Sequence, residues 1–429
     1  MKNPYAEDFS HANLCLRPNS QAEQKWRIRM RRKIMTVLTL GTLASLALSG
    51  CGAGKANDTK LTVWTNMSVE EETIRRYADE WGEANGYEVE VIHQSPSVQQ
   101  FAQAINSPDG PDAVVGIPND QLADYVNAGL SAKVPDDLYH DEDFSEAAVQ
   151  ACYVGGDRYA APLSVETTAL FYNTDMVSQV PDTWEELVEQ AAKDGGVSFD
   201  ATSIYYDLGF VRACGGYIFQ YENGAYDVSD IGLANEGAVK AYEFINDLCN
   251  EYHLLSADVT ADIARSNFQN GQTAYFIGGP WDIDGFTSAG TNFGISRMPT
   301  FNGQPFVTPV GTQISFVSSK SGKQDKAWEM IMYLIDNGAM EMYESGDRIP
   351  AKLSDQDNEA IQQNEYSKAF IAQINDGEPM PTVSEMGQLW GIHTNNIRSM
   401  WTGELTPAEA AGNMVKQLEE AVALMNSGK

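Results

Sequence analysis

Residues 61–92 contain a strand pattern, a helix pattern and a second strand pattern, in that order. The apolar runs at 61–64 and 87–92 predict strands, and apolar residues recur every three or four positions between them. Ser68 and Glu71 have the spacing of a capping box that would begin the intervening helix. A crossover of this kind joins parallel strands in a sheet with covered faces, so we expect an α/β fold.

The length of the chain predicts two lobes. Removing residues 1–50, which have a different character, leaves 379 of the 429 residues. This exceeds the roughly 250 to 300 residues at which single cores stop growing. The alternation of strands and helices restarts near residue 165, returns to the first lobe near 307 and crosses again near 350. We therefore expect an N-terminal lobe formed by residues 60–164 and 307–350, and a C-terminal lobe formed by residues 165–306 and 351–429.

The first 50 residues read as an export signal. Five basic residues between 27 and 33 precede an apolar run from Ile34 to Leu48, which is too short for a comfortable membrane span of roughly 20 residues. The run ends in Leu-Ser-Gly-Cys, which resembles the bacterial lipoprotein box. We expect cleavage to leave Cys51 as a lipidated first residue, followed by a small, polar linker to residue 59.

This interpretation predicts that the protein is exported and anchored by lipid to the outer face of the bacterial cytoplasmic membrane. Residues 1–29 are polar and unpatterned, whereas a signal of ordinary length would start at Met30. We interpret Met30 as the natural start. The alternatives are a long charged leader and, for Cys51, an ordinary small residue just past a cleavage point.

The charge of the body excludes several partners. The whole chain has a net charge of −32, and the part after residue 50 has 20 basic and 57 acidic residues, a net charge of −37. Such a body repels phosphate backbones and anionic lipid head groups, so we expect no nucleic acid partner and membrane contact only through the anchor. We expect a monomer.

Motifs for cofactor, metal or nucleophile chemistry are missing. The chain has no Walker sequence and no Gly-x-Ser-x-Gly elbow, and its histidines are isolated, so we expect no cofactor and no metal. Cys152, Cys214 and Cys249 are an odd number at wide spacing, which is not a disulfide framework. One optional bridge between Cys152 and Cys214 stays open.

Ordered sequence blocks resemble the maltose/maltodextrin-binding proteins. The blocks occur in the family's order and spacing at residues 161–166, 172–173, 215–217, 221–227, 268–274, 278–281, 298–305 and 380–381, with Trp390 near the end. This resemblance implies a two-lobed, periplasmic-binding-protein-like α/β fold with hinge crossovers. It also implies an unmodified oligosaccharide in the cleft between the lobes, and delivery to the membrane permease subunits of an ABC importer.

The resemblance also implies binding residues, and their chemistry suits a sugar. Sugar rings stack on aromatic side chains through C–H faces, and sugar hydroxyls need polar partners. The matching positions make Trp281 and Trp390 stacking platforms and Tyr205 or Tyr206 a further aromatic contact. They also make Glu166 and Asp120 hydroxyl acceptors, with Asn66 and Gln121 as weaker candidates.

The chain departs from the enteric pattern of the family at several of these places. It has Met67-Ser68-Val69 where the family has an aspartate and a lysine, Ile117-Pro118 in place of a tryptophan, and Gly391 and Thr394 in place of a tyrosine and an arginine. Fewer rings and no cationic donors leave the exact sugar open, including trehalose or another oligosaccharide.

A competing hypothesis is a surface glycoside hydrolase that uses Asp120 and Glu166 as its carboxylate pair. This chemistry needs roughly 5 to 10 Å between the carboxyl groups, with the pKa of one of them raised. We prefer a binding protein without enzymatic activity.

Overall fold

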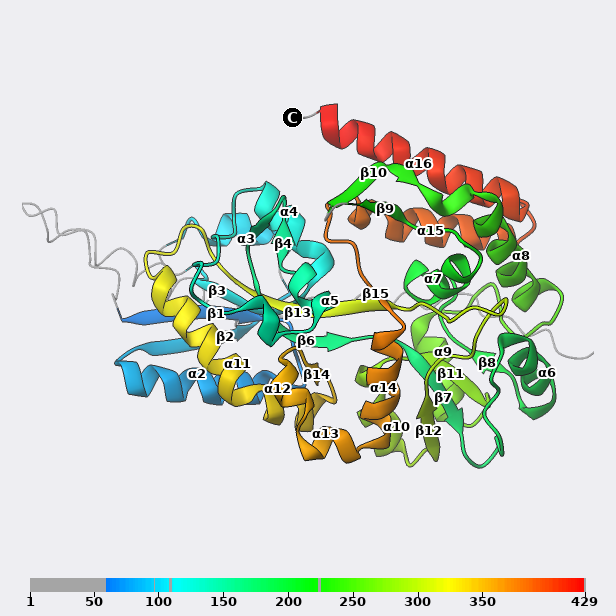
Figure 1. Ribbon diagram of the computed structural model, residues 1–429, viewed down its shortest axis with the longest axis horizontal. Helices are drawn as coiled ribbons and strands as arrows, with labels where there is room; N and C mark the ends of the chain where they lie inside the picture. Colours follow the sequence, from blue (N-terminus) through cyan, green and yellow to red (C-terminus); the bar gives the residue numbers. More distant parts are fainter. Residues whose placement is uncertain (1–58, 96, 108–109, 223–224, 428–429) are drawn as a thin grey trace, which may run out of the picture. The chain divides into compact units, whose positions relative to one another are not determined.

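The computed structural model describes residues 59–95, 97–107, 110–222 and 225–427 (Figure 1). The predictions for the export signal, for Cys51 and for the linker up to residue 58 lie outside the described residues. Within the described part of the chain, no helix has both the length and the apolar character needed to cross a membrane.

The larger sheet has seven strands, in the order β14-β6-β13-β3-β1-β2, with β15 paired to β13. They are β1 (Lys60–Thr65), β2 (Glu88–His93), β3 (Ala113–Pro118), β6 (Ala161–Glu166), β13 (Pro309–Val317), β14 (Ile349–Pro350) and β15 (Glu378–Pro379). Strand β1 is parallel to β2 and β3, which confirms the expected crossover, whereas β13 is antiparallel to β3 and β6. The sheet is therefore mixed.

The smaller sheet has four strands, in the order β12-β7-β11-β8. They are β7 (Ala169–Asn173), β8 (Val197–Ser198), β11 (Tyr275–Gly278) and β12 (Phe293–Ser296), and two hairpins, β4 (Tyr153–Val154) with β5 (Asp157–Arg158) and β9 (Phe219–Glu222) with β10 (Ala225–Ile231), lie outside both sheets. Phe171 in β7 is fully buried, and five aromatic rings lie within 6.4 Å of its own. Aromatic side chains therefore form the core beside this sheet.

Helices pack on and between these strands. They are α2 (Glu71–Asn85), α3 (Val98–Ala104), α4 (Leu122–Asn127), α5 (Glu146–Gln150), α6 (Trp184–Asp194), α7 (Ile204–Ala213), α8 (Glu236–Asn250), α9 (Ala261–Gln269), α10 (Ile283–Ala289), α11 (Gln324–Gly346), α12 (Leu353–Gln356), α13 (Glu359–Gln363), α14 (Glu365–Asn375), α15 (Met386–Trp401) and α16 (Pro407–Ser427), with short 3-10 turns η1 (Asn119–Gln121), η2 (Asp141–Asp143), η3 (Gly232–Ala234) and η4 (Pro280–Asp282). Helices α2 and α11 lie side by side, as do α15 and α16 (Figure 1).

The capping box expected before α2 is wrong. The helix begins at Glu71, its N-cap residue is Glu70, and no side chain caps it. The reason is a contact distant in sequence: the buried carboxylate of Glu70 accepts a hydrogen bond from Arg348, which fixes the start of the helix from outside.

Two chain segments pass between the sheets and are joined by buried hydroxyls. Strand β6 ends at Glu166 in the larger sheet, and β7 begins at Ala169 in the smaller one. Between them, the Thr167 hydroxyl donates to the carbonyl of Pro309 at 2.8 Å, and its oxygen lies 2.7 Å from Oγ1 of Thr308. These contacts tie the outgoing segment to the returning one.

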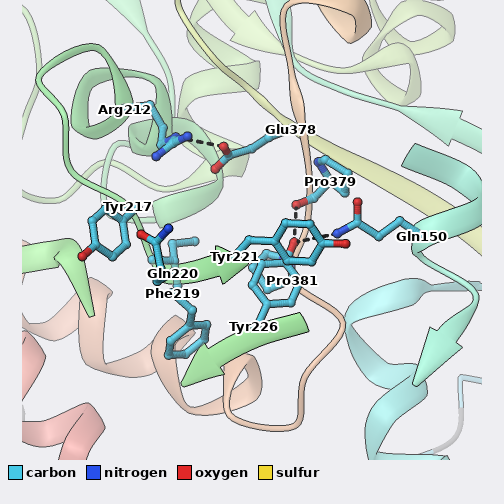
Figure 2. A pocket seen from close by; sticks show the side chains of 11 residues that line it. Gln150, Arg212, Tyr217, Phe219, Gln220, Tyr221, Tyr226, Glu378, Pro379 and Pro381 are labelled. Carbon is cyan, nitrogen blue, oxygen red and sulfur yellow. Dashed lines mark hydrogen bonds and ion pairs between the residues drawn. The ribbon is translucent and has the colours of Figure 1, made fainter. Parts of the chain in front are cut away.

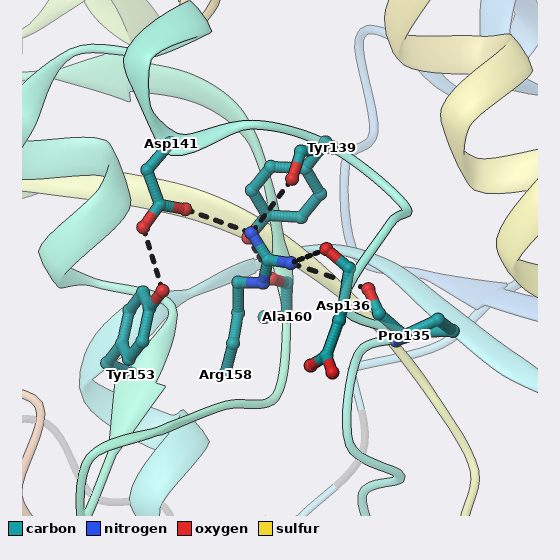
Figure 3. Close-up of polar contacts among 7 residues, drawn as sticks. All are labelled: Pro135, Asp136, Tyr139, Asp141, Tyr153, Arg158 and Ala160. Atoms are coloured by element: carbon teal, nitrogen blue, oxygen red, sulfur yellow. Dashed lines mark hydrogen bonds and ion pairs between the residues drawn. The ribbon is translucent and has the colours of Figure 1, made fainter.

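Arg158 fastens the loop that precedes β6 (Figure 3). Its guanidinium donates to Asp141 at 2.9 Å and to the carbonyls of Tyr139 and Asp136 at 3.0 and 3.1 Å. It also lies 4.1 Å from the centre of the Tyr139 ring, whose hydroxyl donates to the carbonyl of Ala160. The strand that ends in Glu166 therefore starts from a fixed position.

Cys152, Cys214 and Cys249 are free thiols. The optional bridge between Cys152 and Cys214 is absent from the described structure. Burial raises the pKa of each thiol above its ordinary value, which favours the protonated and unreactive form.

Candidate functional site

Trp281 lies in the turn η4, directly after β11 of the smaller sheet. Its indole ring folds back over Gly279, since a Cβ atom at that position would lie 2.3 Å from the ring. Buried Asp282 holds the turn by accepting from the Gly279 backbone N–H at 3.1 Å and from Arg265 at 2.6 Å. The half-buried ring is therefore held in one orientation.

Tyr205 and Tyr206 occupy the first turn of α7, which the side chain of Ser203 caps by accepting from the backbone of Tyr205. The ring centre of Tyr205 lies 6.2 Å from that of Trp281 and 5.7 Å from that of Tyr206. The sequence predicted Tyr205 or Tyr206, and the structure places Tyr205 near Trp281 and Tyr206 beside Tyr205. Three rings thus form one aromatic cluster.

Asp120 in η1 meets Trp390 of α15, although the two are 270 residues apart. The indole Nε1 of Trp390 donates to Oδ2 of Asp120 at 3.3 Å. Burial raises the pKa of Asp120, and the hydrogen bond from Trp390 opposes this shift. Burial, followed by the charges of Tyr206 and Asp120, raises the pKa of Tyr205, so Asp120 lies within electrostatic reach of the aromatic cluster.

Asn119 explains why these distant residues meet. Its side chain is buried, accepts from the backbone of Thr312 in β13 at 3.1 Å and donates to the hydroxyl of Thr382 at 2.9 Å. Thr382 precedes α15, so one amide fixes both the turn that carries Asp120 and the segment that leads to Trp390.

Glu166 is held by an ion-pair network. Its Oε1 accepts from Gln313 of β13 at 3.0 Å, and its Oε2 forms an ion pair with Nη1 of Arg348. Arg348 also binds Oε1 of Glu70 at 2.9 Å. One guanidinium therefore joins two carboxylates, and Glu166 is a fixed, charge-compensated acceptor.

The carboxylate of Glu166 and the hydroxyl of Tyr205 both lie close to Gly311. A Cβ atom on this residue of β13 would lie 3.6 Å from the Tyr205 hydroxyl and 3.6 Å from Oε1 of Glu166. The Tyr205 hydroxyl is buried and has no hydrogen-bond partner among the described residues. An aromatic hydroxyl with free capacity therefore lies beside the fixed carboxylate.

The weaker candidates are less well placed. Asn66 directly follows β1 and Gln121 ends η1, and both are half-buried. No hydrogen bond among the described residues joins either side chain to Asp120, Glu166 or the aromatic rings.

Two of the departures noted in the sequence, Met67 and Ile117, are buried apolar side chains. Met67 is 3% exposed, and its sulfur fills the space beside Gly116 of β3, where a Cβ atom would lie 2.0 Å from it. Gly116 has a φ of 70°, so a side chain there would also strain the backbone. Ile117 is buried as well. These positions contribute shape to the fold, and their side chains offer no charged donor.

A pocket of about 260 Å³ elsewhere in the structure is lined by none of the predicted residues (Figure 2). Several of its polar groups are already paired within the protein. Arg212 pairs with Glu378 at 2.8 Å, and Gln150 donates to the hydroxyl of Tyr226 at 3.3 Å. We therefore place the candidate site at the cluster around Trp281, whose hydroxyl and carboxyl groups have free capacity.

Sequence reasoning missed Arg348, Gln313, Gly311 and Asn119. Nothing in the local sequence indicates their contacts, because each acts on a residue far away along the chain. In the described residues, no group of three or more histidine, cysteine, aspartate or glutamate side chains has the arrangement of a metal site.

Known proteins are similar to this chain in sequence. The family described as bacterial extracellular solute-binding proteins matches residues 76–369. The galactooligosaccharide-binding protein of Bacillus subtilis is 28% identical, covering 94% of this chain and all of the relative. The maltooligosaccharide ABC transporter solute-binding lipoprotein of Streptococcus pneumoniae serotype 4 is 26% identical over 91% of this chain and 97% of its own length.

Solved structures agree. The maltose-maltodextrin binding protein of Alicyclobacillus acidocaldarius superposes with a TM-score of 0.79 at 30% identity, over 84% of this chain and all of the other. A cyclo/maltodextrin-binding protein complexed with maltotetraose gives a TM-score of 0.78 at 28% identity, over 85% and 97% of the two chains.

The mixed sheets and the structural matches show a periplasmic-binding-protein-like α/β fold, which confirms the expected fold class. The chain belongs to the bacterial extracellular solute-binding protein family. Its relatives include maltooligosaccharide- and maltodextrin-binding proteins, as the sequence blocks predicted.

Proposed function

We propose that this protein captures maltose- or maltodextrin-type oligosaccharides and delivers them to an ABC importer. The observation that carries the proposal is that aromatic rings and carboxylates lie together. The rings of Trp281, Tyr205 and Tyr206 form one cluster. Gly311 lies between Tyr205 and Glu166, and Asp120 is hydrogen-bonded to Trp390. Flat rings cover the apolar faces of glucose units, and carboxylates accept from their hydroxyls. Asn66 and Gln121 are peripheral candidates.

The two sheets support a division into lobes that close around the sugar. We assign residues 60–164 and 307–350 to one lobe and residues 165–306 and 351–429 to the other. Thr167 and its partner Thr308 lie where the chain passes between the sheets, so the hinge belongs there. Ligand binding must favour the closed arrangement of the lobes to shift the population toward it.

Export and anchoring complete the proposal. A signal over residues 1–50 followed by lipidated Cys51 would hold the monomeric receptor on the outer face of the cytoplasmic membrane, beside its permease subunits. The relative from Streptococcus pneumoniae, described as a lipoprotein, supports this part of the proposal.

A receptor for a different oligosaccharide is the second candidate. The similarity to a galactooligosaccharide-binding protein extends over that relative's whole length, so the family match alone does not select the sugar. The buried Met67 and Ile117, which replace charged and aromatic residues of the enteric pattern, favour a changed specificity.

Hydrolysis by Asp120 and Glu166 is disfavoured by the setting of Glu166. An inverting or retaining glycosidase needs one carboxylate as a base or nucleophile and the other as an acid. Glu166 is already bound by Arg348 and Gln313, which compensate its charge and hold it in one position. We propose a binding role without catalysis.

The test is calorimetric titration of protein that begins after Cys51. The ligands are maltose, maltotriose, longer maltodextrins, trehalose, a β-linked galacto-oligosaccharide and cellotriose, and released monosaccharide is assayed in parallel. Saturable binding of α-glucans with no sugar released supports the proposal. Binding of the galacto-oligosaccharide alone selects the second candidate, and released sugar overturns the binding role.

A further inference from the structure

A carboxyl group and an imidazole are buried together where α7 meets α15. Asp207 directly follows Tyr205 and Tyr206 in α7, and His393 lies one turn after Trp390 in α15. Both side chains are 0% exposed, and Nε2 of His393 lies 3.8 Å from Oδ2 of Asp207. The pair therefore joins the two helices that carry three of the proposed ligand contacts.

The tautomer of His393 follows from its other contact. Its Nδ1 lies 3.0 Å from the backbone carbonyl of Thr202, and a carbonyl can only accept, so Nδ1 carries a hydrogen. In a neutral ring Nε2 is then an acceptor. An ionised Asp207 is also an acceptor only, so the two facing atoms would repel unless one of them carries a proton.

The burial of Asp207 also favours its protonation. Neither carboxyl oxygen of Asp207 has a hydrogen-bond partner among the described residues, and Nε2 of His393 has none either. A buried, isolated carboxylate normally takes up a proton. Burial, with the charge of Asp200, raises the pKa of Asp207 well above its usual value, and burial lowers the pKa of His393 to about 4.

The surrounding groups do not offer another countercharge. Asp200 is itself acidic and accepts from the backbone and hydroxyl of Thr202 at 3.2 and 2.7 Å. Tyr242 of α8 has its ring centre 6.0 Å from that of His393, and burial with the charge of Asp207 raises its pKa. Among the ion pairs of the described residues, His393 is the partner of Asp207.

We propose that Asp207 and His393 hold one shared proton at neutral pH and act as a positioning pair, fixing the Tyr205–Tyr206 turn relative to Trp390. At 3.8 Å the two atoms are not hydrogen-bonded, so the proton resides on Oδ2 or on Nε2, and in either case the buried pair has no net charge. The positioning role rests on the proposed function, because it assumes that these rings bind the ligand. The shared proton does not depend on that function.

The shared proton makes the stability of the fold depend on pH. In the unfolded chain Asp207 is ionised above a pH of about 4, and His393 loses its charge above about 6.5. Folding therefore takes up one proton above pH 6.5, and this contribution to stability falls as pH rises. Asp207→Asn supplies an N–H in place of the proton and removes the titration.

The first experiment uses the ligand-free protein that begins after Cys51. Nitrogen NMR of the His393 ring and the infrared carbonyl band of Asp207 are recorded at pH 7, with Asp207→Asn to assign the band. A protonated Asp207 beside a singly protonated ring, or an ionised Asp207 beside a doubly protonated ring, supports the shared proton. An ionised Asp207 beside a singly protonated His393 overturns it.

Thermal unfolding gives a second readout. The melting temperature of the wild type should fall more steeply between pH 7 and pH 9 than that of Asp207→Asn. Identical slopes would contradict proton uptake on folding by the pair. His140→Asn, a substitution of an exposed histidine, is the matched control and should follow the wild type.

The positioning role is tested by affinity for maltotriose at pH 7. Asp207→Asn, which keeps a donor to Nε2, should bind within about threefold of the wild type, whereas Asp207→Leu should bind at least about tenfold more weakly. Equal affinities of the Asn and Leu variants overturn positioning. If wild-type protein binds none of the tested sugars, the proposed function and this positioning role fail together. The spectroscopic result still shows whether the Asp207–His393 pair holds one proton.

Discussion

Asp120 and Glu166 are acidic groups at the ends of two strands of one sheet, and the protein holds them differently. Asp120 follows β3, and the neutral indole of Trp390 is its side-chain donor. Glu166 ends β6 and is bound by the amide of Gln313 and by Arg348, which also binds Glu70. One carboxylate is charge-compensated by the protein, whereas the other is bound by neutral groups.

The difference separates two tasks. An oxygen with neutral donors keeps capacity for a ligand hydroxyl, and burial has raised the pKa of Asp120, so a further donor would stabilise its charge. A carboxylate bound by a guanidinium keeps its position whether or not a ligand is present. We therefore expect Asp120 to contribute chiefly to affinity and Glu166 chiefly to the geometry and stability of the site.

Removing Arg348 should have the largest effect. Arg348→Met leaves Glu70, which is 2% exposed, without its partner and should lower the free energy of unfolding by about 3 to 5 kcal/mol. Urea unfolding measures this. Lys326→Met, which breaks an exposed pair with Glu329, is the control and should cost less than about 1 kcal/mol. Equal losses in the two variants would refute the distinction between the two settings.

Asp120→Asn should weaken sugar binding by about 1.5 to 3 kcal/mol, since it removes a charged acceptor, and should leave stability nearly unchanged. Glu166→Gln should lose stability as well, because it breaks the pair with Arg348. Titration calorimetry and urea unfolding on both variants give the comparison. Loss of stability in Asp120→Asn with full affinity would reverse the assigned tasks.

A third carboxylate tests the role of charge compensation. Burial raises the pKa of Asp347 to about 6, with a smaller contribution from the charge of Asp284. Because this pKa lies above the unfolded value, the stability that Asp347 contributes is present below about pH 4 and is lost as pH rises through 6.

Asp347→Asn should therefore raise the free energy of unfolding by about 1 to 2 kcal/mol at pH 7 and have no effect near pH 4. Asparagine tolerates the left-handed backbone at this position, where φ is 55°. Unfolding at the two pH values is the measurement. An equal gain in the free energy of unfolding at pH 4 and pH 7 would mean that the Asn side chain stabilises the protein for a reason other than the titration of Asp347.

Thr167→Val should have the smallest effect, about 1 kcal/mol of stability, because it removes the hydroxyl that joins the two segments between the sheets. Urea unfolding checks the loss. Thr402→Val, at an exposed helix end, is the control. If Thr167→Val were as stable as this control, the hydroxyl contacts would not hold the crossing segments together.

Local patterns predicted the elements well where neighbouring residues decide them. The strands expected at 61–64 and 87–92 and the helix between them occur, because the patterns that predict them lie within a few residues. The cap expected at Ser68 failed because Glu70 binds Arg348, which is 278 residues away. Periodicity carries no information on such a partner.

The same limit applies to the site. Trp281 and Tyr205 could be named from their sequence blocks, and the structure brings their rings together. The contacts of Arg348 and the pairing of Asp207 with His393 could not be predicted from the sequence, because a charged or titratable side chain gives no sign of its partner. Residue type predicted chemistry, and the fold determined which groups act together.

The central claim is that the ligand binds at the cluster around Trp281. Calorimetric titration with maltotriose of the wild type, Trp281→Ala and Tyr221→Ala tests it most directly, because Tyr221 is an exposed ring in the other pocket (Figure 2). We predict that Trp281→Ala loses about 2 to 4 kcal/mol of binding free energy and that Tyr221→Ala binds like the wild type. Undiminished binding by Trp281→Ala, with loss in Tyr221→Ala, would contradict the account.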